Sequence, residues 1–295
     1  METMLGRTLP TGDEPIGESW EISDREEAMS RVRSENAETL HNLWMNHRAE
    51  VFGAALLSHP SPRFPLLMKI LDACDDLSIQ VHPPASVAAE FGGDPKTEMW
   101  FVAHADPGAK IYAGLREGVT RESFDSALHS GTVADVVHVL HPRSGDCLFI
   151  PSGRIHAIGA GLLIYEIQQN SDTTYRVFDW NRTDAAGNPR QLHIEESLRS
   201  IDFTDFAPGM AVPSEDGTLA VCEFFDVKKK QPSSDRAAGR VGKSLTLAVT
   251  RGTLSIGGLA LRAGDFCLIP ACLSAEARRF EECSADSHWL EIRIP

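Results

Sequence analysis

The stretch LFIPSGRIHAIGAGLLIYEIQQNSDTTYRVFDW, residues 148–180, is the part of the chain around which the rest must be arranged. Its apolar runs at 148–150 and 162–164 are short and bounded by Gly and Pro, which predicts two strands. The glycine-rich turn between them carries His156, and the polar segment after them leads to Arg176. We therefore expect a histidine and an arginine directed at one site, with further partners supplied by the remaining chain.

Composition favours strands and argues against nucleic acid as a partner. The 17 prolines and 23 glycines break the 295 residues into short apolar runs, which suits a strand-rich fold better than a helix bundle. The net charge of −14 disfavours binding to phosphate backbones, which need a basic face. A small anionic substrate is still compatible with this charge, because a few local Lys and Arg side chains can form an anion pocket.

We expect neither a secretion signal nor a membrane span. The first 24 residues lack a basic region followed by an apolar one, and no run approaches the ~18 apolar residues of a spanning helix. The six cysteines show no CxxC pair and no disulfide spacing. Because such cysteines suit a reducing compartment, we expect a cytoplasmic protein without membrane contact.

The chain is predicted to form two β-rich domains, residues 1–207 and 208–295. The composition shifts near Pro208, and the part beyond it consists of short predicted strands separated by polar loops. The run Lys228-Lys229-Lys230 is expected to lie in a solvated loop and not to bind phosphate. The second domain is the smaller one.

An internal repeat links the two parts. GDCLFIPS at 145–152 and GDFCLIPA at 264–271 share the pattern G-D-x-x-x-I-P. In the same alignment, His156 of the first copy corresponds to Ala275 of the second. We expect two copies of one structural unit, the second without a metal ligand; the alternative is a chance match of a common turn–strand phrase.

Two further segments offer polar side chains on one strand face. In residues 77–83, LSIQVHP, alternation puts Ser78, Gln80 and His82 on the face opposite the apolar residues. In residues 96–102, KTEMWFV, it puts Lys96 and Glu98 together. Polar side chains that face the interior are costly unless they bind something, so these faces are candidates for a site.

The candidate ligands suit a borderline divalent ion, with zinc the best fit. They are two imidazoles, one carboxylate and one amide oxygen: His82, His156, Glu98 and Gln80. Two histidines and one carboxylate also fit redox iron, as in facial-triad oxygenases, and this alternative stays open. Each residue has a structural reading as well, since histidines in turns and glutamates on strands are often solvated.

Five segments together resemble type I mannose-6-phosphate isomerase, most closely its short bacterial form. They are GESWEISD at 17–24, IQVHP at 79–83, KTEMW at 96–100, PSGRIHAIG at 151–159 and EIQQNSDTTYR at 166–176. The resemblance is dense over about residues 15–205 and weak beyond. The large helical insertion of longer members is absent, and the C-terminal domain is abbreviated.

The resemblance implies two cupin-like β-barrel (jelly-roll) domains with a few short helices, the second smaller and without metal. It also implies one zinc ion and the reversible conversion of mannose 6-phosphate, a small sugar phosphate, to fructose 6-phosphate. The family's metal ligands fall on Gln80, His82, Glu98 and His156. Its active-site arginine falls on Arg176 and its lysine on Lys96.

This chemistry gives the two basic residues expected roles. Isomerisation through an enediol needs proton transfer, which suits Lys96, and we expect nearby zinc to depress the pKa of this lysine. Arg176 is expected to bind the phosphate or to stabilise the enediolate, and the sequence does not decide between these roles. Structural alternatives are a surface position for Lys96 and a bridge from Arg176 to Asp172 or Asp179.

Three residues are weaker candidates for the sugar pocket: Trp20, Ser78 and Trp100. Core packing is the alternative use of both tryptophans. A competing function is a non-isomerase metal-binding cupin, either an iron dioxygenase or a sugar-binding regulator. Gln80 argues against the dioxygenase, where a histidine is usual, and Lys96 with Arg176 argues against a pure binding protein. The sequence leaves open whether the protein is a monomer or a homodimer.

Overall fold

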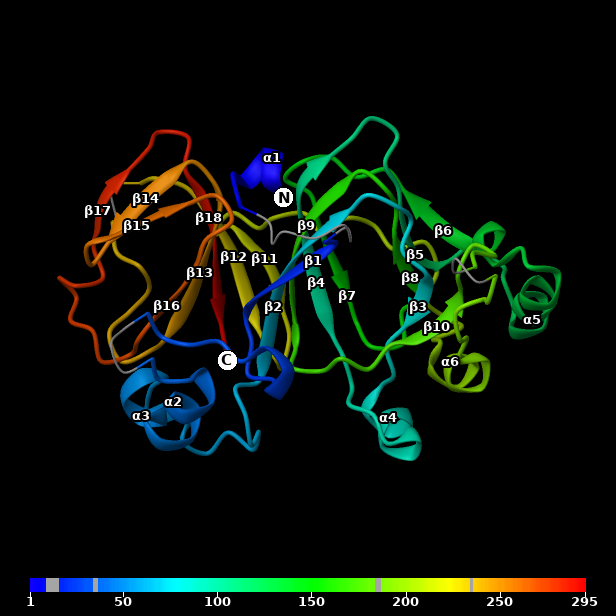
Figure 1. Cartoon of the computed structure of the whole chain (residues 1–295), viewed down its shortest axis with the longest axis horizontal. Helices are drawn as coiled ribbons and strands as arrows, with labels where there is room; N and C mark the ends of the chain where they lie inside the picture. Colours follow the sequence, from blue (N-terminus) through cyan, green and yellow to red (C-terminus); the bar gives the residue numbers. More distant parts are fainter. Residues whose placement is uncertain (9–15, 34–36, 184–186, 234–235) are drawn as a thin grey trace. The chain divides into compact units, whose positions relative to one another are not determined.

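Antiparallel strands joined by a few short helices make up most of the structure, a computed structural model (Figure 1). It describes residues 1–8, 16–33, 37–183, 187–233 and 236–295. The chain divides into two compact units, one of residues 14–19 and 71–211, the other of residues 1–13, 20–70 and 212–295. The boundary between the units after residue 211 lies close to the predicted domain boundary after residue 207. Residues 20–70, however, belong to the same unit as residues 212–295.

Backbone hydrogen bonds explain that grouping. The carbonyl of Val51 accepts the N–H of Ala271, and the carbonyl of Phe52 accepts the N–H of Ser244. Helices α2 (Leu40–Asn46) and α3 (Arg48–Val51) thus belong with residues 212–295, a long-range pairing that strand patterns do not reveal. Whether residues 1–207 and 208–295 behave as domains in solution stays a prediction.

The unit of residues 71–211 contains most of two five-stranded sheets. The first has the order β1 (Glu18–Ile22), β2 (Leu66–Ala73), β9 (Leu162–Gln169), β4 (Glu98–Ala105), β7 (Cys147–Ile150). The second has the order β10 (Tyr175–Phe178), β3 (Ile79–Val81), β8 (His156–Ile158), β5 (Ile111–Leu115), β6 (Val137–Leu140). The predicted strands at 148–150 and 162–164 are confirmed, whereas His156, expected on a turn, begins a short buried strand.

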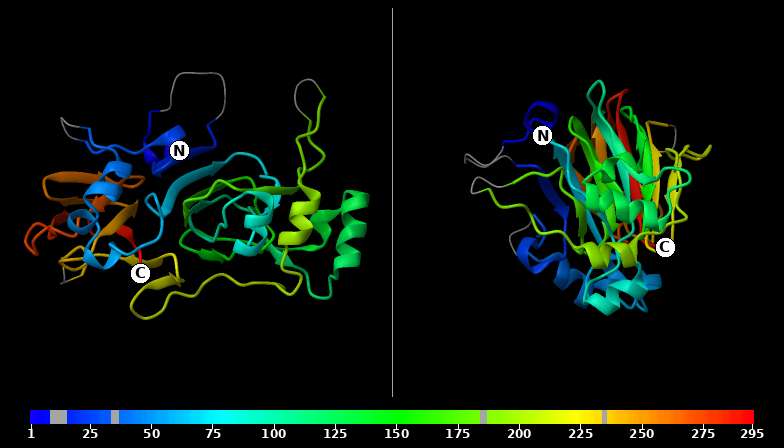
Figure 2. Two further views of the ribbon diagram at one scale, coloured as in Figure 1. Left: turned by 90° about the horizontal axis from the view of Figure 1, so that it is seen from below. Right: turned by 90° about the vertical axis from the view of Figure 1, so that its right-hand side faces the viewer.

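An apolar core lies between these two sheets. Trp100, Leu148 and Ile164 from the first sheet pack with Ile111 and Ile158 from the second. The opposite face of the second sheet is covered as well: α5 (Arg121–Ser130) and α6 (Ile194–Ser200) lie beside each other there (Figure 2), and Arg121 donates a hydrogen bond to the Leu198 carbonyl. Burial on both faces excludes water from the space between the sheets.

The register of the second sheet puts four residues in one row. Arg176 of β10 pairs with Gln80 of β3, Gln80 pairs with His156 of β8, and His156 pairs with Ala113 of β5. Directly paired residues of antiparallel strands point to the same face. The flanking residues Ile79 and Val81 point to the opposite face and pack in the apolar cluster that includes Phe124 of α5. The row of four residues therefore faces the first sheet.

The second unit has one five-stranded and one three-stranded sheet. The larger has the order β11 (Thr218–Val221), β12 (Asp226–Lys230), β18 (His288–Arg293), β13 (Leu245–Arg251), β16 (Phe266–Ile269). The smaller has the order β15 (Leu259–Arg262), β14 (Thr253–Ile256), β17 (Phe280–Cys283). The Lys228–Lys230 run therefore lies in a strand, and its prediction as a loop is wrong: its backbone pairs with β18.

The remaining helices are short. They are α1 (Glu2–Leu5), η1 (Glu26–Ala28), η2 (Ala54–Leu56), α4 (Ala85–Phe91) and η3 (Val133–Asp135). Among the residues described, no helix has the length and apolar character needed to cross a membrane.

The predicted internal repeat is confirmed at the level of the backbone. The N–H of Gly145 donates to Val102 and the N–H of Gly264 to Val249, and the two glycines have φ values of 96° and 95°. Asp146 and Asp265 each accept a backbone N–H three residues earlier in the chain. The strands that follow, β7 and β16, are the edge strands of their five-stranded sheets.

Strand register extends the repeat to the metal ligands. Ile150 pairs with Glu98, and its counterpart Ile269 pairs with Leu245. Leu245 therefore stands in the second unit where Glu98 stands in the first. Together with Ala275 in place of His156, this substitution leaves the second copy without counterparts of two candidate ligands.

Arg278 holds the loops of the second unit together. It is 1% exposed, and within the described part of the chain it donates to four backbone carbonyl oxygens, those of Leu273, Ala238, Lys243 and Pro270. A guanidinium can satisfy several carbonyls at once because its donors form a planar fork. Arg278 thereby links four backbone positions that lie between residues 238 and 273.

We expect Arg278→Ala to lower the free energy of unfolding by at least ~3 kcal/mol, since the four charge-assisted hydrogen bonds of a buried side chain are lost. The urea midpoint measures this change. Arg279→Ala is the matched control, because the neighbouring side chain is exposed. Equal midpoints for the two variants would contradict the role of Arg278.

Candidate metal centre

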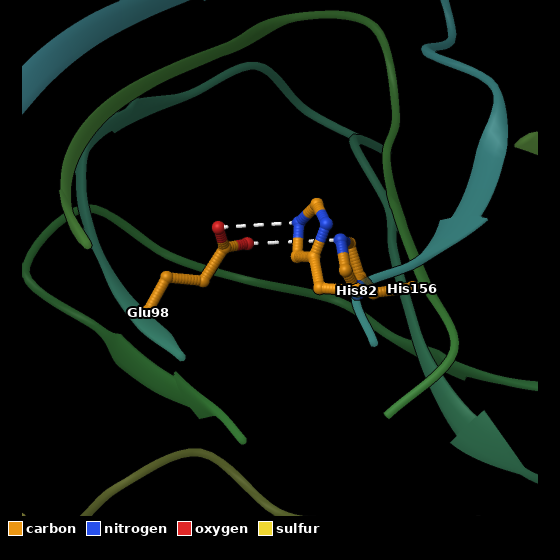
Figure 3. Close-up of side chains that lie close together, drawn as sticks. All are labelled: His82, Glu98 and His156. Carbon is orange, nitrogen blue, oxygen red and sulfur yellow. Dashed lines mark ion pairs between the residues drawn. The ribbon is translucent and has the colours of Figure 1, made fainter. Parts of the chain in front are cut away.

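One carboxylate and two imidazoles meet between the sheets of the unit of residues 71–211 (Figure 3). Glu98 begins β4, His156 begins β8, and His82 directly follows β3. Glu98 Oε2 lies 3.3 Å from His82 Nε2, and Glu98 Oε1 lies 3.6 Å from His156 Nε2. One ligand atom from each residue lies within 4.8 Å of the others, which makes a possible metal site.

Backbone carbonyls orient both imidazoles. The Nδ1–H of His156 donates to the Arg154 carbonyl at 2.8 Å, and the Nδ1–H of His82 donates to the Thr173 carbonyl at 3.0 Å. With the proton on Nδ1, each ring turns the lone pair of Nε2 toward Glu98. Histidine ligands of metals are commonly held by such a second hydrogen bond.

Three polar atoms that face the centre lack hydrogen-bond partners among the described residues. His82 Nε2 and both carboxylate oxygens of Glu98 are buried without one, and the residues themselves are at most 1% exposed. Buried polar atoms are nearly always paired, so a convergent group without partners needs an explanation. A divalent cation bound by these atoms would supply it.

The charges also suit a cation. Burial raises the pKa of the Glu98 carboxyl and the neighbouring Lys96 ammonium lowers it, with the net result that this pKa lies well below its ordinary value. Burial lowers the pKa of His156 to about 3 and also lowers the pKa of His82. Glu98 is thus ionised and both imidazoles are neutral, which are the forms that bind metals.

Gln80 and Arg176 adjoin the centre from the same sheet row. The Gln80 carboxamide contacts His156, with 3.3 Å between Nε2 of the amide and Nε2 of the ring. Arg176 donates from Nη1 to the Gln191 carbonyl at 2.9 Å, and its buried Nε has no hydrogen-bond partner. Arg176 forms no ion pair with any residue that the structure describes, so neither suggested bridge to an aspartate forms.

Lys96 is buried, 5% exposed, so the alternative of a surface lysine is wrong. Its Nζ lies 3.2 Å from Glu98 Oε2 and 3.9 Å from Glu166 Oε1. Burial lowers the pKa of Lys96, but Glu98 and Glu166 outweigh this effect and raise it above its ordinary value. We expected zinc to lower the pKa of Lys96, and the two carboxylates act on this pKa in the opposite direction.

Glu166 is the residue of this site that the sequence reasoning missed. It is 4% exposed and accepts a hydrogen bond from Trp100 Nε1 at 2.9 Å. The signal was a glutamate inside the apolar strand 162–167, where alternation puts it on the same face as Leu162 and Ile164. A buried carboxylate in such a strand needs a positive partner, here Lys96.

The three weaker candidates have different surroundings. Trp100 is fully buried and packs edge-on against the His156 ring, 5.3 Å between centroids. Ser78 is buried just before β3. Trp20 lies in β1, with the Lys69 ammonium 4.4 Å from its ring centroid. Contact of any of them with substrate stays a prediction.

Comparison with known proteins gives consistent matches. The family model described as phosphomannose isomerase type I, catalytic domain, matches residues 1–94. Mannose-6-phosphate isomerase of Streptococcus mutans is 38% identical over 280 residues, which cover 90% of this chain and 85% of that protein. Mannose-6-phosphate isomerase ManA of Bacillus subtilis is 34% identical over 258 residues, covering 84% and 79%.

A solved structure agrees over nearly the whole length. The crystal structure of mannose 6-phosphate isomerase from Bacillus subtilis superposes with a TM-score of 0.82 at 29% identity, covering 99% of this chain and 94% of that one. Similarity of this extent, in sequence and in fold, leaves one conclusion: the chain belongs to the type I phosphomannose isomerase family.

Proposed function

We propose that this protein is a zinc-dependent mannose-6-phosphate isomerase that interconverts mannose 6-phosphate and fructose 6-phosphate. The observation that carries the proposal is the buried Glu98 carboxylate facing two imidazoles, with Lys96 beside it and Arg176 in the sheet row of Gln80 and His156. Membership of the isomerase family supports this reading over a dioxygenase or a sugar-binding regulator. The proposal includes two cupin-type jelly-roll barrels, catalytic and degenerate, and action in the cytoplasm as a monomer or homodimer.

His82, Glu98, His156 and Gln80 would hold the zinc ion. The donor set of two imidazoles, a carboxylate and an amide oxygen suits zinc. The two ends of the Gln80 carboxamide exchange by a half-turn of the group, so its oxygen can take the place near His156 that the nitrogen occupies. Bound zinc supplies a Lewis acid that polarises the substrate's carbonyl and hydroxyl oxygens.

Lys96 is assigned to proton transfer. Aldose–ketose isomerisation removes the proton from C2 and delivers one to C1 through an enediol, while a hydroxyl proton moves between O2 and O1. Glu98 and Glu166 keep Lys96 as an ammonium ion, so it enters the reaction as a proton donor to a substrate oxygen. Glu166 positions Lys96 and is itself held by the indole of Trp100.

Arg176 is assigned to the anionic part of the substrate. Burial lowers the pKa of its guanidinium, and so does Arg190, but the group stays charged at neutral pH. Arg182 and Arg190 both pair with Asp179, which leaves Arg176 without an ion-pair partner among the described residues. That surplus of positive charge favours a phosphate over the enediolate as the partner of Arg176.

The central test is a coupled assay that follows fructose 6-phosphate formation from mannose 6-phosphate. We expect turnover in the zinc-loaded protein, loss of turnover after chelation, and recovery when zinc is restored, because the ion supplies the Lewis acid. If the zinc-loaded protein shows no turnover, the proposal is wrong. Oxygen uptake measured on the same preparation tests the dioxygenase alternative.

Glu98→Gln should weaken zinc binding strongly, because it removes the only charged group of the ligand set. The loss of affinity should exceed the ~10–100-fold loss that is typical when a residue hydrogen-bonded to a metal ligand is mutated. Metal content after dialysis measures the effect. Glu166→Gln is the control, since its carboxylate contacts Lys96 and not the histidines. That variant should keep its zinc; equal metal loss in both would contradict the assigned ligand set.

Arg176→Ala should lower kcat/KM by ~10²–10³-fold, the usual loss when one charged group that meets the reacting substrate is removed, with zinc still bound. The coupled assay and a metal analysis measure both quantities. Arg199→Ala is the control, because this arginine pairs with Glu90 on an exposed face. Full activity of the Arg176→Ala variant would refute its role.

A further inference from the structure

A cavity of about 620 Å³ lies in the unit of residues 20–70 and 212–295. It follows the face of the five-stranded sheet that carries the apolar cluster around Leu247, Val249 and Trp289. Cavities that bind small molecules measure roughly 300–1,000 Å³, so this one is large enough for a metabolite.

The unequal widths of the two sheets account for the cavity. The three-stranded sheet β15-β14-β17 packs its apolar residues, among them Leu254 and Phe280, against part of the five-stranded sheet. On the remaining part, strands β12 and β18 turn polar residues to the same face, because Lys228 pairs with Glu291 and Lys230 with Trp289. These residues line the cavity.

The cavity corresponds in strand position to the metal centre of the first unit. Leu245, the counterpart of Glu98, lines it. Trp100 pairs with Glu166, and in the second unit Leu247 pairs with Glu291, so Glu291 is the counterpart of Glu166 and also lines the cavity. The second copy has thus lost its metal ligands and kept a polar space in their region.

The lining is strongly cationic although the chain carries a net charge of −14. Two side-chain carboxylates line the cavity, Asp226 and Glu291, and five basic side chains line it as well: Lys228, Lys230, Arg240, Lys243 and Arg293.

Among the described residues, two of the five basic groups have an ion-pair partner and three have none. Lys228 pairs with Asp216, and Arg293 pairs with Glu291. Lys230, Arg240 and Lys243 form no ion pair with any described residue. A solvated lysine needs no ligand, but three uncompensated cations around one cavity in an acidic protein favour an anion there.

Buried groups in the same cavity suit hydroxyls. Glu291 is 5% exposed, and Asp226 Oδ1 is buried without a hydrogen-bond partner. The Trp289 indole N–H lies beside the Glu291 carboxylate without completing a hydrogen bond to it or to any other described residue. Carboxylate acceptors and an indole donor next to a cationic rim match a ligand with both hydroxyl and phosphate groups.

We propose that this cavity binds a sugar phosphate at a second site, separate from the metal centre and without a metal of its own. Lys230, Arg240 and Lys243 contact the phosphate, while Asp226 and Glu291 accept hydrogen bonds from the hydroxyls. The inference stands on the second unit alone and holds whether or not the first unit is an isomerase.

Calorimetric titration of the full-length Glu98→Gln/Arg176→Ala protein tests the proposal, because this double variant removes both the charged metal ligand and the arginine assigned to the substrate phosphate in the first unit. Fructose 6-phosphate should bind at one site, and fructose and inorganic phosphate should each bind at least about tenfold more weakly, since each lacks half of the contacts. No binding of fructose 6-phosphate, or equally tight binding of either probe, would overturn the proposal.

Substitutions then locate the site. In the same background, Lys230→Gln should weaken fructose 6-phosphate binding at least about tenfold through loss of a charge-assisted hydrogen bond. Lys229→Gln, the neighbour on the opposite strand face, should change binding less than about twofold. Equal effects of the two would exclude the cavity. Arg240→Gln, whose side chain is exposed, repeats the test if the melting curve shows that Lys230→Gln has unfolded.

Discussion

The structure of the first unit depends on one buried charge, the Glu98 carboxylate. Burying an ion without compensation costs several kcal/mol even after relaxation, so its surroundings must supply positive charge and donors. Lys96 supplies the charge, and two imidazoles oriented by backbone carbonyls turn their lone pairs toward the same point. That arrangement only partly satisfies the carboxylate, because both of its oxygens lack hydrogen bonds. The Glu98 carboxylate and the two imidazoles together therefore form a possible metal site.

Local patterns revealed much of this arrangement. Alternation in residues 77–83 grouped Gln80 with His82, and alternation in residues 96–102 grouped Lys96 with Glu98, because side chains of a strand change faces at every residue. The pairing of Gln80 with His156, 76 residues apart, does not follow from alternation and needs the sheet order. For the same reason Glu166 was missed: its partnership with Lys96 exists only once β9 lies beside β4.

The repeat shows how one scaffold serves two purposes. The turn at Gly145 and the turn at Gly264 use the same backbone hydrogen bonds, so the edge strand forms without any help from the metal ligands. In the second unit Leu245 stands at the position of Glu98, so no carboxylate is buried at that position. The loops of that unit are joined by hydrogen bonds from Arg278 to backbone carbonyls. The short motif shared by the two copies predicted the turn and the strand that follows it. The strand at Lys228–Lys230 was not predicted, because a run of polar residues is typical of a loop.

The sheet row that joins Arg176, Gln80 and His156 has a consequence for how the protein tolerates change in chain length. A shift of one residue in β10 would exchange the two faces of that strand. Arg176 would then turn toward the apolar layer under α5, and Tyr175 or Val177 would take its place between the sheets. Insertions and deletions are therefore excluded from the strands of this sheet, and variation in length must concentrate in the loops, such as the one between α5 and β6, that leave the register unchanged.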